Sequence, residues 1–201
     1  MIFYWFIQYF LIWPIAGIIL RIFYKIEVRG RENLTGVRAP LIIVSNHKTL
    51  LDGFLIVISM PWLSPILPGR YITEEFDFRS KVLRLIARLR ILKLFYLLTG
   101  GFPSGRGQGI EKAIKFPTRI LEKGGTVLMF PEGFLIRGDE LGYFYHGTSA
   151  LALEAKVLIL PIHIKTRRGY IRVTFGKVFN LDAASREAGT EILKKKIQDL
   201  Q

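Results

Sequence analysis

The absence of charge from the first twenty residues is the feature that most limits how this chain folds. Gln8 is the only clearly polar side chain in residues 1–20, and aromatic residues are spread along the segment. Roughly 20 apolar residues are enough to span a bilayer, but Pro14 interrupts the stretch, so a helix lying in the membrane interface fits equally well. A buried core helix is the alternative outside a membrane.

Basic residues follow this segment at once, at Arg21, Lys25, Arg29 and Arg31. Positive charges next to an apolar segment favour the cytoplasmic side. No basic region precedes the segment and no small-residue cleavage site ends it, so we do not expect its removal as a signal peptide. We expect residues 1–24 to be a membrane anchor and residues 25–201 to be one domain on the cytoplasmic face.

The composition is both apolar and basic. Half of the 201 residues are hydrophobic, and 29 Lys and Arg against 16 Asp and Glu give a net charge of +13. A nucleic-acid binder of this charge would keep its apolar residues inside, so the combination favours a membrane partner and no nucleic acid. The chain has no Cys, which excludes disulfides, a Cys-ligated metal and a thiol nucleophile.

Short apolar runs alternate with longer amphipathic stretches along the rest of the chain. Apolar runs predict strands at residues 25–31, 41–44, 126–130, 157–164 and 170–178. Helices are predicted at residues 50–58, 80–98, 110–123, 150–155 and 183–200, with a proline-rich loop after residue 60 and a glycine-rich loop at 100–109. This alternation predicts an α/β domain.

His47 is the only histidine with an acid a short turn away, because Asp52 follows after four residues. If the chain turns sharply after the strand at 41–44, Asp52 can accept a hydrogen bond from one imidazole nitrogen. The other nitrogen can then take a proton from a substrate hydroxyl. This is the arrangement of a catalytic triad with the substrate in place of the protein nucleophile.

Four blocks of sequence resemble those of the glycerolipid acyltransferases of the lysophosphatidic acid acyltransferase (PlsC) type, in the same order. They are Asn46-His47 to Asp52, Gly101-Phe102-Pro103 to Arg106-Gly107, Phe130-Pro131-Glu132-Gly133 and Leu160-Pro161-Ile162. The resemblance implies a glycerol-3-phosphate acyltransferase-like fold, with a mixed central sheet flanked by helices. It also implies transfer of a fatty acyl group from acyl-CoA or acyl carrier protein to the free sn-2 hydroxyl of lysophosphatidic acid, with no further cofactor.

The same resemblance makes His47 the catalytic base and Asp52 its orienting partner. It implies that the second and third blocks bind the acceptor, and the predicted substrate ligands are Asn46, Arg106, Glu132, Gly133 and Arg137. A guanidinium such as that of Arg106 in a glycine-rich loop suits a phosphate. Glu132 binds the acceptor or simply orients its loop.

The sequence departs from the family pattern at two places where cations are common. Phe134-Leu135-Ile136 stand where the family has Thr-Arg-Ser, so Arg137 is the available substitute, and Tyr145 replaces a lysine. Another acceptor, such as glycerol 3-phosphate or a different lysophospholipid, is therefore the main alternative. A non-catalytic membrane-binding protein is the alternative from another class, although the retained His47 and Asp52 argue against it.

The remaining polar residues support no metal site. No cluster of His, Asp and Glu has the spacing of metal ligands. We expect His146 to be a structural or surface residue and His163 to lie on a strand surface. Lys48 is a candidate for stabilising the oxyanion, with an ordinary exposed lysine as the alternative.

Overall fold

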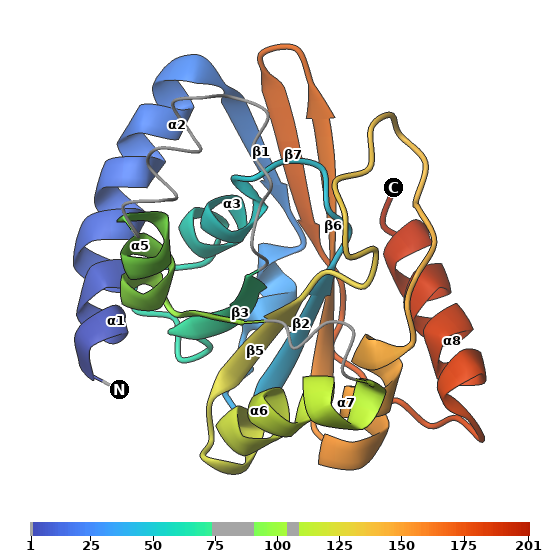
Figure 1. The fold of residues 1–201 in the computed structure, drawn as a ribbon. Helices are drawn as coiled ribbons and strands as arrows, with labels where there is room; N and C mark the ends of the chain where they lie inside the picture. Colours follow the sequence, from blue (N-terminus) through green and yellow to red (C-terminus); the bar gives the residue numbers. More distant parts are fainter. Residues whose placement is uncertain (1, 74–90, 104–108) are drawn as a thin grey trace.

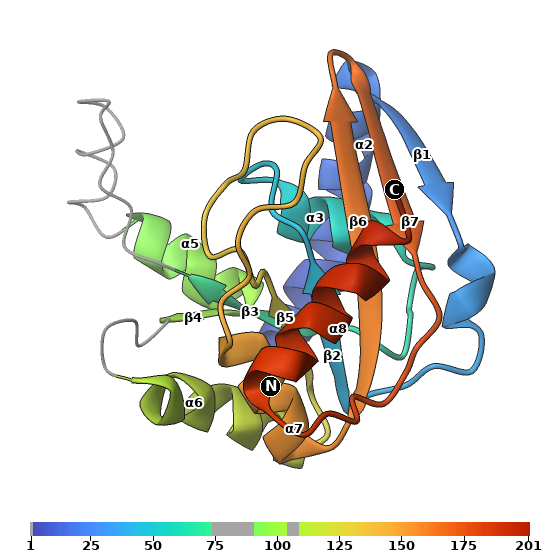
Figure 2. The same ribbon diagram turned by 90° about the vertical axis from the view of Figure 1, so that its right-hand side faces the viewer.

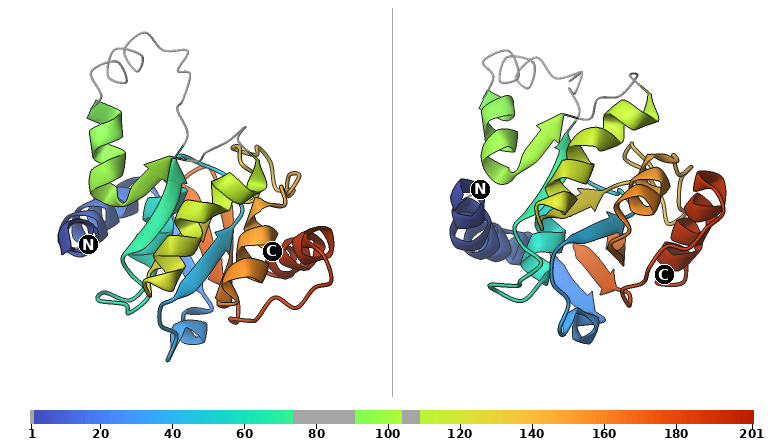
Figure 3. Two further views of the ribbon diagram at one scale, coloured as in Figure 1. Left: turned by 60° about the horizontal axis from the view of Figure 1, so that its bottom comes forward. Right: turned by 90° about the horizontal axis from the view of Figure 1, so that it is seen from below.

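The computed structural model describes residues 2–73, 91–103 and 109–201, and in these ranges a seven-stranded sheet lies between two layers of helices (Figure 1). One face of the sheet carries the N-terminal helix, α3 (Asp52–Ser59) and α5 (Ile91–Thr99). The other face carries α6 (Ile110–Glu122), α7 (Gly147–Ala155) and α8 (Arg186–Gln198), as the view from below shows (Figure 3). The predicted α/β fold with a mixed sheet flanked by helices is confirmed.

The sheet has the strand order β1-β7-β6-β2-β5-β3-β4. The strands are β1 (Lys25–Arg29), β2 (Leu41–Ser45), β3 (Gly69–Thr73), β4 (Gly101–Pro103), β5 (Thr126–Met129), β6 (Leu158–Arg167) and β7 (Tyr170–Phe175). All neighbours are parallel except β6 and β7, which form an antiparallel hairpin. The central strand β2 is parallel to β5 and β6, so the turns that follow β2 and β5 meet at one edge of the sheet. Ligands of open α/β sheets bind at this edge.

Alternation along β2 divides the core into two parts. Leu41 and Ile43 pack with α3 and the N-terminal helix, whereas Ile42 and Val44 pack with α6, α7 and α8. The strand is buried on both faces, as expected for a parallel strand covered by helices on both sides.

The N-terminal segment is one continuous helix composed of α1 (Ile2–Phe6), η1 (Ile7–Ala16) and α2 (Gly17–Phe23). Residues 4–23 are long and apolar enough to cross a membrane, yet a third of this stretch is buried against the domain. Gln8 Nε2 donates hydrogen bonds to the carbonyls of Gly69 (2.7 Å) and Thr99 (2.8 Å), and Trp13 Nε1 donates to Met60 O (3.1 Å). The helix is therefore packed into the domain rather than tethered to it.

The structure differs from the predicted elements mainly at the sheet edge. The predicted glycine-rich loop contains β4, and the proline-rich loop ends in β3, which the sequence did not reveal. Both strands are short and flanked by Gly or Pro, so they lack a periodic apolar signal. The predicted helix at 80–98 falls partly outside the described residues, and its described end is α5.

Candidate active site

The strand β2 lies between β5 and β6 in the sheet (Figure 2). The chain turns after Ser45, the last residue of β2, so His47 lies just beyond this end of the strand. Val44 pairs with Met129 of β5, so the turn after β2 lies beside the turn that begins at Phe130. The imidazole of His47 stacks on the ring of Phe130, with 4.2 Å between centroids and 18° between planes. Two predicted strand-end turns thus form a single site.

Asp52 fixes the conformation of this turn. Its fully buried carboxylate accepts hydrogen bonds from His47 Nδ1 (2.8 Å), from the backbone N–H groups of Lys48 (2.6 Å) and Thr49 (2.9 Å), and from Thr49 Oγ1 (2.7 Å). Asp52 also begins α3, where the partial positive charge of the helix N-terminus stabilises a carboxylate. These bonds hold His47 in the tautomer with the proton on Nδ1, so Nε2 is the basic nitrogen.

Glu132 connects the two turns. Its Oε2 accepts the backbone N–H of His47 (2.5 Å), and its Oε1 accepts the backbone N–H of Gly142 (2.7 Å). The side chain is 1% exposed. Gly133 follows with φ of +67°, a conformation that favours glycine. Both oxygens of Glu132 hold backbone, which supports the loop-orienting role that the sequence left open; its predicted substrate contact, like that of Gly133, remains a prediction.

Asn46 is completely buried, and its side chain bonds to β6 just past the point where β2 ends. Its amide nitrogen donates to Ile164 O (2.8 Å), and its amide oxygen accepts from Ile164 N (2.7 Å). The side chain thereby extends the β2–β6 pairing by one step after the backbone has turned away. Asn46 therefore positions the turn, and its predicted substrate contact remains a prediction.

Residues 134–142 form a loop that bonds to the turn after β2. Ile136 N–H donates to His47 O (2.8 Å), and Lys48 Nζ donates to Gly138 O (3.0 Å) and Glu140 O (2.7 Å). Lys48 therefore fastens the loop, and two of its three N–H groups are not available for the oxyanion predicted from the sequence. Arg137 is exposed beside Ile136. Its substrate contact remains a prediction, and Arg106 lies outside the described residues.

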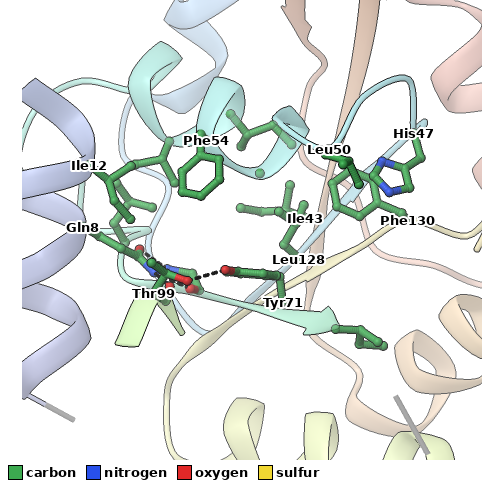
Figure 4. Close-up of a pocket in the computed structure, with 16 residues that line it drawn as sticks. Gln8, Ile12, Ile43, His47, Leu50, Phe54, Tyr71, Thr99, Leu128 and Phe130 are labelled. Atoms are coloured by element: carbon green, nitrogen blue, oxygen red, sulfur yellow. Dashed lines mark hydrogen bonds between the residues drawn. The ribbon is translucent and has the colours of Figure 1, made fainter. Parts of the chain in front are cut away.

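An apolar cavity of about 820 Å³, counted out to its open mouth, begins at His47. It runs between α3, the sheet and the N-terminal helix (Figure 4). Leu50 and Phe130 lie beside His47 at one end, and Gln8 and Thr99 lie at the other. The cavity is therefore an apolar space with a histidine at one end.

The other two histidines occupy different environments. His146 Nδ1 bonds to Thr190 Oγ1 (3.0 Å) at the α7–α8 contact, which confirms a structural role. His163 is 2% exposed, so its predicted place on a strand surface is wrong. His163 pairs with Thr174 of β7, and α8 packs against β6; the sequence of one strand did not show this packing. Among the described residues, no three His, Asp or Glu side chains are close enough to hold a metal ion.

Comparisons with known proteins point to one family. The acyltransferase family model matches residues 25–165. The 1-acyl-sn-glycerol-3-phosphate acyltransferase of Pseudomonas aeruginosa is 30% identical over 157 residues, 76% of this chain and 53% of the relative. The chloroplastic enzyme LPAT1 of Arabidopsis thaliana is 28% identical over 149 residues, 73% of this chain and 38% of the relative. The chain thus spans about half or less of these relatives.

A solved structure has the same fold. The crystal structure of the 1-acyl-sn-glycerophosphate (LPA) acyltransferase PlsC from Thermotoga maritima superposes with a TM-score of 0.66 at 19% sequence identity. The match covers 94% of this chain and 78% of that one. With the family model covering most of the sequence, the chain belongs to the acyltransferase family.

Proposed function

We propose that this protein transfers a fatty acyl group from an acyl thioester to the sn-2 hydroxyl of lysophosphatidic acid, giving phosphatidic acid. The observation that carries the proposal is the His47–Asp52 pair at one end of an apolar cavity. The cavity suits an alkyl chain, and its position brings the carbonyl at the head of that chain to the base. The names of the relatives, all 1-acyl-sn-glycerol-3-phosphate acyltransferases, support this acceptor.

The reaction requires one base and no covalent enzyme intermediate. His47 Nε2 takes the proton of the acceptor hydroxyl while the hydroxyl oxygen attacks the thioester carbonyl. Asp52 stabilises the imidazolium that forms. The tetrahedral intermediate collapses by breaking the carbon–sulfur bond, and the proton on Nε2 passes to the departing thiolate. The donor, acyl-CoA or acyl carrier protein, is a co-substrate, and no cofactor or metal takes part.

The surface beside the cavity supports binding to a membrane interface. The N-terminal helix exposes several large apolar side chains, among them Phe10, Ile18 and Ile22. This surface continues through Trp62, whose ring centroid lies 6.4 Å from that of Phe10 in an edge-to-face arrangement. Gln8 and Trp13 bond the opposite side of the helix to the domain, so we propose that the helix lies in the interface and does not span the bilayer. Burial of this surface would bring the cavity to the lipid.

The basic residues that follow the helix support the cytoplasmic leaflet as the bound surface, because anionic lipids attract Lys and Arg. Protease digestion of sealed vesicles tests both proposals. If the protein is bound to one side of the membrane, protease added on that side should remove both chain ends. A spanning helix would protect one end.

The decisive experiment for the enzyme is transfer from labelled oleoyl-CoA to lysophosphatidic acid by purified protein in detergent. We expect product with the wild type and with His146→Ala, and a fall of about 10²- to 10⁴-fold with His47→Ala. Activity of His47→Ala near the wild-type level would refute the assignment of the base. A preference for glycerol 3-phosphate or another lysolipid would change the acceptor. Absence of transfer with every donor and acceptor would leave a membrane-binding protein.

A further inference from the structure

Residues 61–64, called the 61–64 turn below, connect α3 towards β3 and present two apolar side chains at their tip. The N–H of Ser64 donates to Pro61 O (3.1 Å), which closes a β-turn with Trp62 and Leu63 as its central residues. Both of these side chains are exposed, Trp62 by 52% and Leu63 by 49%. The turn therefore holds a tryptophan and a leucine outward in a fixed conformation.

The backbone of Leu63 is in a conformation that is unfavourable for leucine. Its φ is +60°, and the third position of a β-turn with positive φ normally holds Gly or Asn. Among the described residues other than glycine, only Lys156 also has a positive φ. Leu63 belongs to neither core cluster, so packing in the core does not account for a leucine here. Such strain is typical of positions where the side chain has a function outside the fold.

Two hydrogen bonds with Tyr9 fasten the 61–64 turn to the N-terminal helix. The hydroxyl of Tyr9 donates to Ser64 O (2.5 Å), and Trp62 Nε1 donates to Tyr9 O (3.3 Å). The loop between α3 and β3 consequently lies beside the N-terminal helix (Figure 3). The tip of the turn is thus held at a fixed position next to the apolar side chains of that helix.

The turn continues the apolar surface of the helix without adding charge. The ring centroid of Trp62 lies 6.4 Å from that of Phe10 and 6.5 Å from that of Trp13. Residues 53–69 contain no Asp, Glu, Lys or Arg, and only residues 1–20 form a longer stretch of this kind. A protein partner would favour polar groups at the rim of the contact, whereas an uncharged surface rich in tryptophan fits the interface of a lipid bilayer.

We infer that the 61–64 turn inserts Trp62 and Leu63 into the acyl-chain region of a phospholipid bilayer, as a second membrane contact beside the N-terminal helix. The inference rests on the proposed position of that helix in the membrane interface. A helix lying in the interface can roll about its own axis, and a second contact beside the helix prevents this roll. Ile12 of the helix and Leu67, which follows the turn, both line the apolar cavity. The turn therefore fixes the orientation of the cavity relative to the lipid.

Insertion can be measured with a single fluorescent label, because the chain has no Cys. In Leu63→Cys protein bound to phosphatidylcholine vesicles, the label should be quenched by lipid-attached nitroxides and protected from iodide in the water. Lys156→Cys is the matched control, since Lys156 is exposed, has φ of +49° and follows α7 on the opposite face of the sheet. Its label should stay accessible to iodide.

The outcomes separate this inference from the proposed function. If the protein binds vesicles and iodide still quenches the label at position 63 as in free protein, the inference is overturned and the enzyme is unaffected. A protein that binds no vesicles overturns the inference together with the interfacial helix. Because neither readout uses acyl transfer, an inactive protein with a protected label would contradict the enzyme and support the membrane contact.

Glycine substitution distinguishes lipid contact from a role in folding. Leu63→Gly removes both the side chain and the unfavourable φ, so the midpoint of chemical denaturation should not fall. Its binding to phosphatidylcholine vesicles should weaken by about tenfold, the effect expected from the exposed half of a leucine side chain. Lys156→Gly relieves the same kind of strain and should leave binding to these neutral vesicles unchanged. Unchanged vesicle binding by Leu63→Gly, or a lower denaturation midpoint, contradicts the inference.

Discussion

Replacing Glu132 by Gln distinguishes a carboxylate that holds the catalytic turn from one that binds substrate. Glu132 accepts the backbone N–H groups of His47 and Gly142 in a site that is almost fully buried. A glutamine of the same shape has only one oxygen. Its amide nitrogen would face one of these two N–H groups, donor against donor, and that bond would be lost.

The size of the effect follows from the kind of bond. A hydrogen bond to a charged group contributes about 1.5–3 kcal/mol, and the buried N–H is left without a partner. Since each 1.4 kcal/mol corresponds to a factor of ten, the catalytic turn should be correctly formed about 10- to 150-fold less often. Substrate bound elsewhere in the cavity is unaffected. We therefore expect kcat to fall by this factor while the KM for the acceptor changes by less than about twofold.

The assay is steady-state transfer with varied lysophosphatidic acid, with circular dichroism of each variant to verify folding. Glu122→Gln provides the matched control, because Glu122 is an exposed glutamate at the end of α6. A rise of tenfold or more in KM with an unchanged kcat would refute the positioning role and restore Glu132 as a substrate ligand.

Three further changes test other parts of the structure. Asn46→Ala leaves the N–H and C=O of Ile164 in β6 without their side-chain partner and should lower the free energy of unfolding by about 2–5 kcal/mol in chemical denaturation. Asn180→Ala, at an exposed position, should have little effect. Ile12→Phe fills the far end of the cavity and should shift donor preference to shorter acyl chains in competition assays, unlike Ile19→Phe on the exposed side of the same helix. His163 takes up its proton near pH 4 in the folded protein and near pH 6.5 in the unfolded chain, so the unfolded chain binds more protons between these values. Stability should therefore fall by up to roughly 3 kcal/mol as the pH drops from 6.5 to 4, and His163→Phe should flatten this dependence in denaturant titrations at several pH values.

The catalytic pair could be predicted from the sequence because its geometry is local. Asp52 lies five residues after His47, and one turn at a helix N-terminus is enough to join them. The central strands were equally visible, since a parallel strand covered on both faces is continuously apolar. The edge strands β3 and β4 carry no such pattern, and only their pairing with β5 and with each other defines them.

The roles of the buried polar residues depend on contacts that are distant in sequence. The resemblance to the family implies that Asn46 and Glu132 bind substrate. The structure adds that Asn46 bonds to Ile164 and Glu132 to His47, 118 and 85 residues away. A polar side chain that bonds to backbone groups holds the chain in place, whatever motif contains that side chain. The same criterion applied in reverse singles out His163, whose buried Nε2 has no hydrogen-bond partner among the described residues. The sequence placed His163 on a strand surface because the packing of β6 against β7 and α8 is a property of the folded chain. The position of unsatisfied polar atoms is therefore the part of a site for which a structure is indispensable.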